Sequence, residues 1–152
     1  MDPNKAHILV VDDEMGPRES LKMILHPYYN VHVAERGGQA LDYLNKFPVD
    51  LVTLDLKMPG FTGINVLEKV KQHDPDIEAI IITGYGSLDT AIEGLRLGAF
   101  DYLMKPFDLR QVEAVVKRAL EHHDLVVARH QGHGHREPAS EHHRVIVGQQ
   151  FL

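Results

Sequence analysis

The feature that most constrains the fold of this chain is the alternation of short apolar runs with longer stretches of helical spacing. Five strand-sized runs lie at residues 8–11, 31–34, 51–54, 79–82 and 102–104. After each run, apolar residues recur at intervals of three and four, as at Leu21, Ile24 and Leu25. Strands that alternate with helices predict an α/β fold with a parallel sheet, right-handed crossovers and helices on both faces.

The composition is that of a globular protein and excludes several other classes. The net charge of -6 disfavours direct binding of the folded part to nucleic acid. The chain has no cysteine, which excludes disulfides and thiolate metal sites. No apolar run approaches the ~18 residues of a membrane span, and the N-terminus lacks the pattern of a signal peptide. We therefore expect a cytoplasmic protein that does not bind membranes.

The character of the chain changes near its C-terminal end. The last amphipathic pattern can continue past Leu120, but from about residue 129 glycine, proline and histidine replace it, and seven of the 11 histidines lie between 122 and 143. Flexible histidine clusters bind transition metals weakly, and no second element places ligands here, so we expect adventitious binding or none. We interpret residues 129–152 as a His-rich linker or tail, or as the start of a further domain.

Five polar residues follow directly from the ends of four predicted strands. They are Asp12, Asp13, Asp55, Thr83 and Lys105. Each alone has an ordinary explanation as a cap, a turn residue or a solvated side chain. In an open parallel sheet, however, ligands bind beyond the carboxyl ends of the strands. The coincidence of all five at this edge predicts a functional site.

The charges of these residues indicate what the site needs. Carboxylates about 4 Å apart repel by about 4 kcal/mol per pair at an effective dielectric constant near 20, so Asp12, Asp13 and Asp55 cannot all stay ionised unaided. An all-oxygen pocket with room for water suits Mg²⁺. Lys105 adds a fixed positive charge, and the combination is suited to holding a phosphoryl group. Asp55 is then the natural nucleophile, forming an aspartyl phosphate.

The stretches that carry these residues are ILVVDDE, DLVTLDLKMPGFTG and IIITGYGSLDTAIEGLRLGAFDYLMKPF. Over about residues 5 to 123 the chain resembles the receiver domain of bacterial two-component response regulators, and we assign residues 1–128 to that domain. The resemblance implies a doubly wound, flavodoxin-like α/β fold with five parallel strands in the order 2-1-3-4-5. It also implies that Asp55 accepts a phosphoryl group from a sensor histidine kinase.

The resemblance further implies roles for the neighbouring residues. Asp12, Asp13, Asp55 and the carbonyl group of Lys57 would hold Mg²⁺, and Thr83 and Lys105 would contact the phosphoryl oxygens. Tyr102 matches the aromatic residue whose rotamer follows Thr83, so the domain would act as a switch rather than as an enzyme with an external product. The fourth helix, fifth strand and fifth helix would form the surface for a homodimer or an output domain. A cis bond between Lys105 and Pro106 is also expected.

Three rival functions remain open at the level of sequence. A phosphatase of the haloacid dehalogenase type would need an acid two residues after the nucleophile, where this chain has Lys57. A flavodoxin-like cofactor binder would need a first loop that cradles phosphate, where this chain places carboxylates. An interaction module that is never phosphorylated is opposed only by the complete acidic set.

Overall fold

The computed structural model describes residues 2–58, 62–84 and 88–131, without the side chain of residue 131. Strands and helices alternate through these residues. They are β1 (His7–Val11), α1 (Met15–Leu25), β2 (Asn30–Ala34), α2 (Gly37–Lys46), β3 (Leu51–Asp55), α3 (Gly63–His73), β4 (Glu78–Thr83), α4 (Leu88–Arg96), β5 (Asp101–Met104) and α5 (Leu109–Gln131). None of the helices in the described part of the chain has the length and apolar composition of a membrane span.

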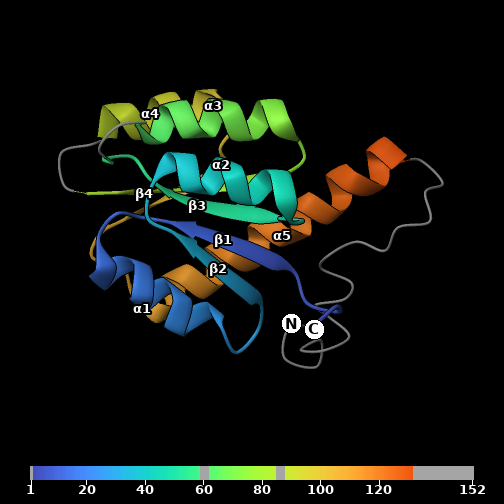
Figure 1. Ribbon diagram of the computed structural model, residues 1–152, viewed down its shortest axis with the longest axis horizontal. Coiled ribbons are helices and arrows are strands. Elements are labelled where there is room, and N and C mark those ends of the chain that lie inside the picture. Colours follow the sequence, from blue (N-terminus) through green and yellow to red (C-terminus); the bar gives the residue numbers. More distant parts are fainter. Residues whose placement is uncertain (1, 59–61, 85–87, 132–152) are drawn as a thin grey trace.

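The five strands form one parallel sheet in the order β2-β1-β3-β4-β5 (Figure 1). This order is the one that the resemblance implied, so the predicted fold is confirmed. The strand order reverses at β1, which lies between β2 and β3. The carboxyl ends of β1 and β3 are therefore neighbours at the point where open α/β sheets bind their ligands.

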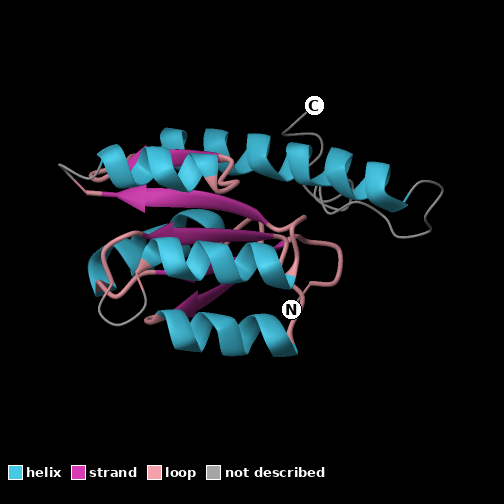
Figure 2. Ribbon diagram, turned by 90° about the horizontal axis from the view of Figure 1, so that it is seen from above, coloured by secondary structure: helices cyan, strands magenta, loops and turns pink. Residues whose placement is uncertain are grey.

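Helices cover both faces of the sheet, and a separate apolar core lies on each side (Figures 1 and 2). Leu9 and Val11 of β1 point into the core beneath α2, α3 and α4. Ile8 and Val10, the alternate residues of the same strand, point into the core beneath α1 and α5. This arrangement explains why the strands are apolar at consecutive positions.

The observed elements differ from the predicted ones mainly at their ends. Each strand is one or two residues longer than its apolar run, because polar residues also join the strand ladder. Asp108 caps α5 as its position suggests, accepting a hydrogen bond from the Gln111 backbone N–H at 2.8 Å. That helix continues to Gln131, so the domain boundary predicted at residue 128 falls inside a helix. Most of the predicted His-rich segment lies outside the described residues.

Gly63 allows the first turn of α3 to lie directly against the end of β3. A Cβ atom at this position would lie 2.5 Å from the backbone oxygen of Asp55 and 2.5 Å from the Leu56 Cα. Both contacts are with backbone, which cannot rotate away. Gly63 also donates a backbone hydrogen bond to the Leu56 carbonyl at 3.1 Å. The absence of a side chain here therefore fixes the distance between α3 and the segment that carries Asp55.

We expect Gly63→Ala to lower the free energy of unfolding by about 1 to 3 kcal/mol, since the added methyl group forces the backbone apart. Gly38→Ala is a matched control, because Gly38 lies in α2 with nothing within 4 Å of its ideal Cβ position. That variant should be neutral or stabilising by up to about 1 kcal/mol. Urea unfolding of both variants measures the difference, and equal midpoints would contradict the close contact.

Candidate functional site

The topology brings three predicted carboxylates together at the carboxyl edge of the sheet. Asp12 follows β1 directly, Asp13 comes next, and Asp55 is the last residue of β3. One carboxylate oxygen from each lies within 4.8 Å of the others, a spacing that suits a shared metal ion. Asp12 and Asp55 are buried, and Asp13 is exposed. The cluster therefore has two fixed members and one that faces solvent.

Lys105, directly after β5, extends its side chain across the edge to this cluster. Its Nζ atom lies 3.1 Å from Asp12 Oδ2 and 3.5 Å from Asp55 Oδ2. Burial alone would lower the pKa of Lys105, but Glu14, Asp12 and Asp55 outweigh it and raise the pKa. The lysine therefore carries a full positive charge. The peptide bond between Lys105 and Pro106 is cis, as expected.

The environment of Asp55 opposes its negative charge. Burial and the neighbouring Asp12 carboxylate raise the pKa of Asp55 to about 6, against the lowering effects of Lys57 and Lys105. The Lys57 backbone N–H donates to Asp55 Oδ1 at 3.1 Å. This contact places the Lys57 backbone beside the cluster, and ligation by the Lys57 carbonyl oxygen stays a prediction. A cation added at the site would favour the ionised form of Asp55.

The sequence analysis missed two residues that shape the site, Glu14 and Arg18. Glu14 Oε1 lies 3.0 Å from Lys105 Nζ, so three carboxylates contact the ammonium group, and Asp13 lies beside two of them. Only the run of three acids in the sequence hints at this. The charge that remains unbalanced supports a divalent cation.

Arg18 stabilises the cluster through the backbone of Asp12 rather than through a carboxylate. It is buried in α1, and its Nη1 donates to the backbone oxygen of Asp12 at 3.1 Å. The Asp12 backbone N–H donates to the Ala34 carbonyl at 3.1 Å, and Asp12 Oδ1 accepts from the Glu14 backbone N–H at 2.9 Å. The Asp12 peptide groups and carboxylate are thus fixed from three directions. No motif in the sequence predicts this contact, because it depends on how α1 packs beside the end of β1.

Thr83 and Tyr102 lie on the same face of the sheet. Thr83, the buried last residue of β4, is paired with Met104, and Tyr102 is paired with Ile81. Ile81 belongs to the core beneath α2, α3 and α4, and Tyr102 packs against that core from the edge strand. In the described structure the Thr83 hydroxyl donates to the Gly84 carbonyl at 3.2 Å. The hydroxyl therefore has only a local partner that a stronger acceptor could replace.

Comparison with known proteins assigns the family. The family model of the response regulator receiver domain matches residues 8–117. The chain belongs to this family, and it is a receiver domain of the two-component response regulators. This match excludes the rival functions of a haloacid-dehalogenase-type phosphatase and of a flavodoxin-like cofactor binder.

Individual relatives agree with this assignment. The transcriptional regulatory protein ZraR of Escherichia coli K12 is 39% identical over 123 residues, which cover 80% of this chain and 28% of that protein. Sporulation initiation phosphotransferase F of Bacillus subtilis is 42% identical over 114 residues, which cover 74% of this chain and 92% of that protein. The chain spans little more than a quarter of the length of the ZraR proteins that it matches.

Solved structures show the same architecture. The CheY-like receiver domain protein from Methanospirillum hungatei superposes with a TM-score of 0.76 at 32% identity, covering 80% of this chain and 98% of that one. NtrX from Brucella abortus superposes with a TM-score of 0.79 at 32% identity, covering 84% of this chain and 29% of that one. The similarity therefore extends to isolated receiver domains and to receiver domains within longer proteins.

The raised pKa of Asp55 leads to a prediction about stability. Because the pKa of about 6 in the folded state exceeds the ordinary value of 3.8, ionised Asp55 destabilises the fold above about pH 6, and this penalty vanishes below about pH 4. Without Mg²⁺, Asp55→Asn should raise the free energy of unfolding by about 1 to 3 kcal/mol at about pH 7.5 and leave it unchanged near pH 4. Urea unfolding at both pH values tests this, and a variant less stable than the parent at the higher pH would contradict it.

Proposed function

We propose that this domain is a phosphoacceptor switch in which Asp55 takes a phosphoryl group from a sensor histidine kinase. The observation that carries the proposal is the position of Asp55. Its carboxylate is buried beside the strand-order reversal, within 3.5 Å of the Lys105 ammonium group and close to the Asp12 and Asp13 carboxylates. Family membership supports the same role.

The residues at the site are suited to each part of the transfer. A carboxylate oxygen of Asp55 attacks the phosphorus of a phosphohistidine, so that a P–O bond forms while the P–N bond breaks. The departing imidazole nitrogen keeps the electron pair and takes a proton from solvent. Lys105 stabilises the negative charge spread over the phosphoryl oxygens. To do so, its ammonium group exchanges part of its contact with Glu14 for a phosphoryl oxygen.

Asp12, Asp13, Asp55 and the Lys57 carbonyl are the proposed ligands of Mg²⁺. The acidic cluster fits this ion because its donors are oxygens and because Asp13 faces water, which leaves room for water ligands. When bound, the ion neutralises charge on the transferring phosphoryl group and on Asp55. Arg18 contributes by holding the Asp12 backbone in place.

We infer that Thr83 and Tyr102 relay the change. The dianion at Asp55 is a stronger acceptor than the Gly84 carbonyl, since charge-assisted hydrogen bonds are about twice as strong as neutral ones. Movement of the Thr83 hydroxyl toward it would vacate space on the face that Tyr102 shares. An inward rotamer of Tyr102 would then become more populated, a shift between two existing states.

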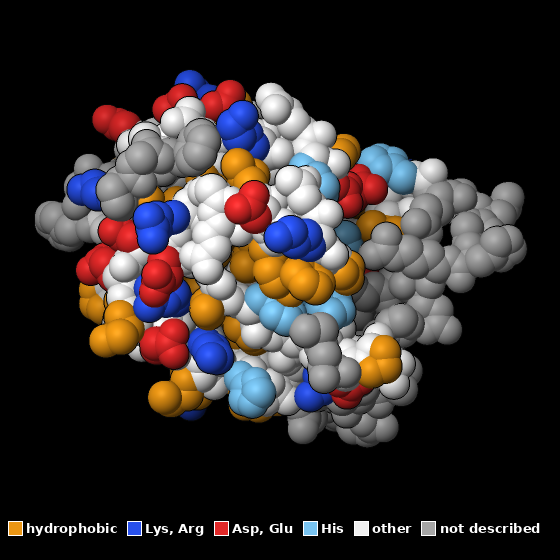
Figure 3. All heavy atoms as spheres, viewed as in Figure 1, with side chains coloured by type: hydrophobic (Ala, Val, Ile, Leu, Met, Phe, Trp, Pro, Cys, Tyr) orange, Lys and Arg blue, Asp and Glu red, His pale blue; other side chains and the backbone are white. Residues whose placement is uncertain are grey.

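The proposed output surface consists of α4, β5 and α5, through which the domain would contact a second copy or an output domain. Leu88 and Ile92 of α4 and Met104 of β5 are exposed apolar residues on these elements. Exposed apolar side chains of this kind suit protein contacts. Figure 3 shows the other side of the molecule, from α2 and the edge strand β2, where acidic and basic side chains are interspersed.

Phosphorylation by a small phosphodonor should require a divalent cation and Asp55. Incubation of the chain with acetyl phosphate and Mg²⁺ should add one phosphoryl mass, and Asp55→Asn should abolish it. Asp13→Ala should reduce the rate by about tenfold or more, because a metal ligand is lost. Intact-mass spectrometry measures the extent of modification.

Asp42→Ala is a suitable control for that experiment, because Asp42 is an exposed acidic residue of α2 outside the acidic cluster. Its phosphorylation should match that of the parent chain. Modification that proceeds at an undiminished rate in excess chelator would refute the role of the metal.

Thr83→Ala should separate phosphorylation from its structural consequence. The variant should accept a phosphoryl group on Asp55 to the same extent as the parent, since Asp55 and Lys105 are intact. It should show little or none of the parent's change in association, measured by light scattering after gel filtration. Thr83→Ser keeps the hydroxyl and should respond like the parent. An equal change in Thr83→Ala and the parent would exclude this relay.

A further inference from the structure

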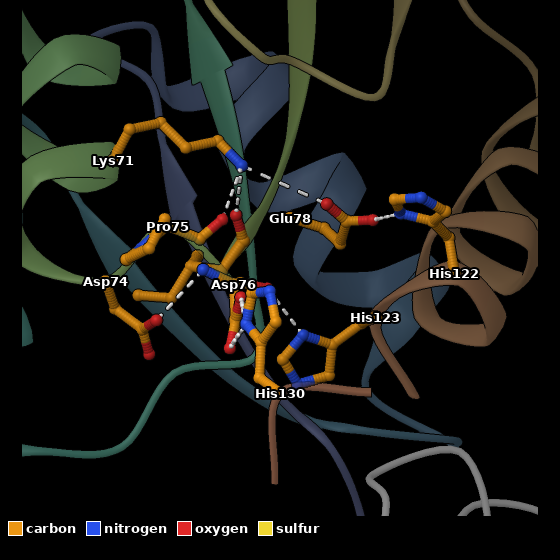
Figure 4. A network of polar contacts seen from close by, with 9 residues as sticks. Lys71, Asp74, Pro75, Asp76, Glu78, His122, His123 and His130 are labelled. Atoms are coloured by element: carbon orange, nitrogen blue, oxygen red, sulfur yellow. Dashed lines mark hydrogen bonds and ion pairs between the residues drawn. The ribbon is translucent and has the colours of Figure 1, made fainter. Parts of the chain in front are cut away.

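A second cluster of charged groups lies at the opposite, amino-terminal edge of the sheet (Figure 4). The C-terminal half of α5 brings three histidines to it. His122 Nδ1 contacts the Glu78 carboxylate at the start of β4. His130 Nδ1 lies 2.8 Å from a carboxylate oxygen of Asp76, in the loop before β4. His123 lies between them and is buried. All three follow residue 117, where the match to the receiver family ends.

His123 is held by two acceptors from two different loops. Its Nδ1 lies 2.7 Å from the backbone oxygen of Asp76, and its Nε2 lies 3.3 Å from Asp50 Oδ1. A carbonyl oxygen only accepts hydrogen bonds, so Nδ1 carries a proton in this contact. An ionised carboxylate also only accepts, so the Nε2 contact requires a proton as well. The geometry is therefore that of an imidazolium ion.

The other charged groups around the cluster decide whether the imidazolium form of His123 is favoured. Those facing it are Asp50 before β3, Asp74 and Asp76 before β4, Glu78 of β4, Asp124 of α5, Lys71 of α3 and the His7 ring of β1. Lys71 lies 4.0 Å from Glu78 and 2.7 Å from the Ile77 carbonyl, on the far side of Glu78 from the helix. The acidic groups outnumber the cations, and the balance favours protonated His123.

The other two histidines, His122 and His130, contribute less to the attachment of α5 to the sheet edge. The side chains of His122 and His130 are half exposed, and exposed ion pairs add little to stability. Near His123, the side chain of Val127 is also buried, whereas that of Leu125 is exposed. In Figure 1 this part of α5 runs past the edge of the sheet. His123 is the histidine of the three whose contacts with the sheet edge are buried.

We propose that protonated His123 is a latch that holds the C-terminal turns of α5 against the amino-terminal edge of the sheet, and that loss of its proton releases them. Neutral His123 can donate through only one ring nitrogen. It would then either leave the Asp76 carbonyl without its hydrogen bond or turn a lone pair toward the Asp50 carboxylate. Both arrangements are unfavourable in a buried position. The released turns would no longer hold a fixed direction relative to the receiver domain.

The ionisation of both partners sets the pH range of the latch. Burial would lower the pKa of His123, but Asp50 and the Asp76 carbonyl outweigh it and raise the pKa. The stability contributed by His123 is therefore complete below about pH 6.5 and is lost as the pH rises through its higher pKa in the folded state. Burial would raise the pKa of Asp50, but His123 and His7 lower it. Its contribution is lost only in acid, below about pH 4.

NMR spectroscopy of the full chain tests the proposal directly. The His123 ring signals should titrate with a midpoint above 6.5, and amide exchange of residues 124–131, corrected for intrinsic rates, should become about tenfold faster or more as the pH passes this midpoint. His26 is an exposed histidine that follows α1, and His26→Gln should leave both results unchanged. A His123 midpoint at or below 6.5, or equal protection of residues 124–131 on both sides of it, would overturn the latch.

Two variants separate the latch from general damage to the fold. His123→Gln should make the protection of residues 124–131 low and independent of pH, while β1 and β3 stay protected. Asp50→Asn keeps the shape of its side chain but removes the charge. It should therefore lower both the His123 midpoint and the pH at which residues 124–131 lose their protection. An unchanged midpoint in Asp50→Asn would contradict the proposal even if His123→Gln failed to fold. None of these measurements needs phosphorylation, so they stand or fall separately from the proposed function of Asp55.

Discussion

The contact between the Lys105 ammonium group and carboxylates from two other strands is the interaction on which the functional edge depends. Lys105 is separated from Asp55 by 50 residues and from Glu14 by 91. These groups meet only because β1, β3 and β5 run parallel and end at the same edge. Without the ammonium group the buried carboxylates would repel one another or take up protons. With it, the carboxylates stay close together. Their negative charge still exceeds the positive charge of Lys105, which favours binding of a divalent cation.

At both edges of the sheet, a cationic side chain is held by acceptor oxygens from other elements, but the two cations respond differently to pH. At the carboxyl edge, the cation between the carboxylates is a lysine, which stays charged across the ordinary pH range. At the amino-terminal edge, it is His123 between Asp50 and the Asp76 carbonyl, and a histidine can lose its proton near neutral pH. The first edge is therefore suited to respond to a phosphoryl group, and the second to a proton.

Much of the fold could be predicted because its determinants are local. The apolar runs at residues 51–54 and 79–82 favour strands because they are short and lie between segments of helical spacing. Asp108 caps α5 through a contact three residues away. The five predicted polar residues could be placed at one edge because each ends or closely follows a run of apolar strand residues. Glu14 and Arg18 were missed because their roles depend on side-chain directions. Arg18 reaches the Asp12 carbonyl only because α1 packs beside the end of β1.

The sequence by itself determined the α/β class, the amphipathic faces and the edge of the sheet at which the candidate site lies. The period of apolar residues and the position of polar groups at strand ends are properties of the chain alone. Only the tertiary structure decided the pKa of Asp55, the partners of Lys105 and the burial of His123. Each of these depends on the distance to groups far away in sequence and on the exclusion of water. The pattern of a sequence contains neither quantity, because both arise only when helices and strands pack together.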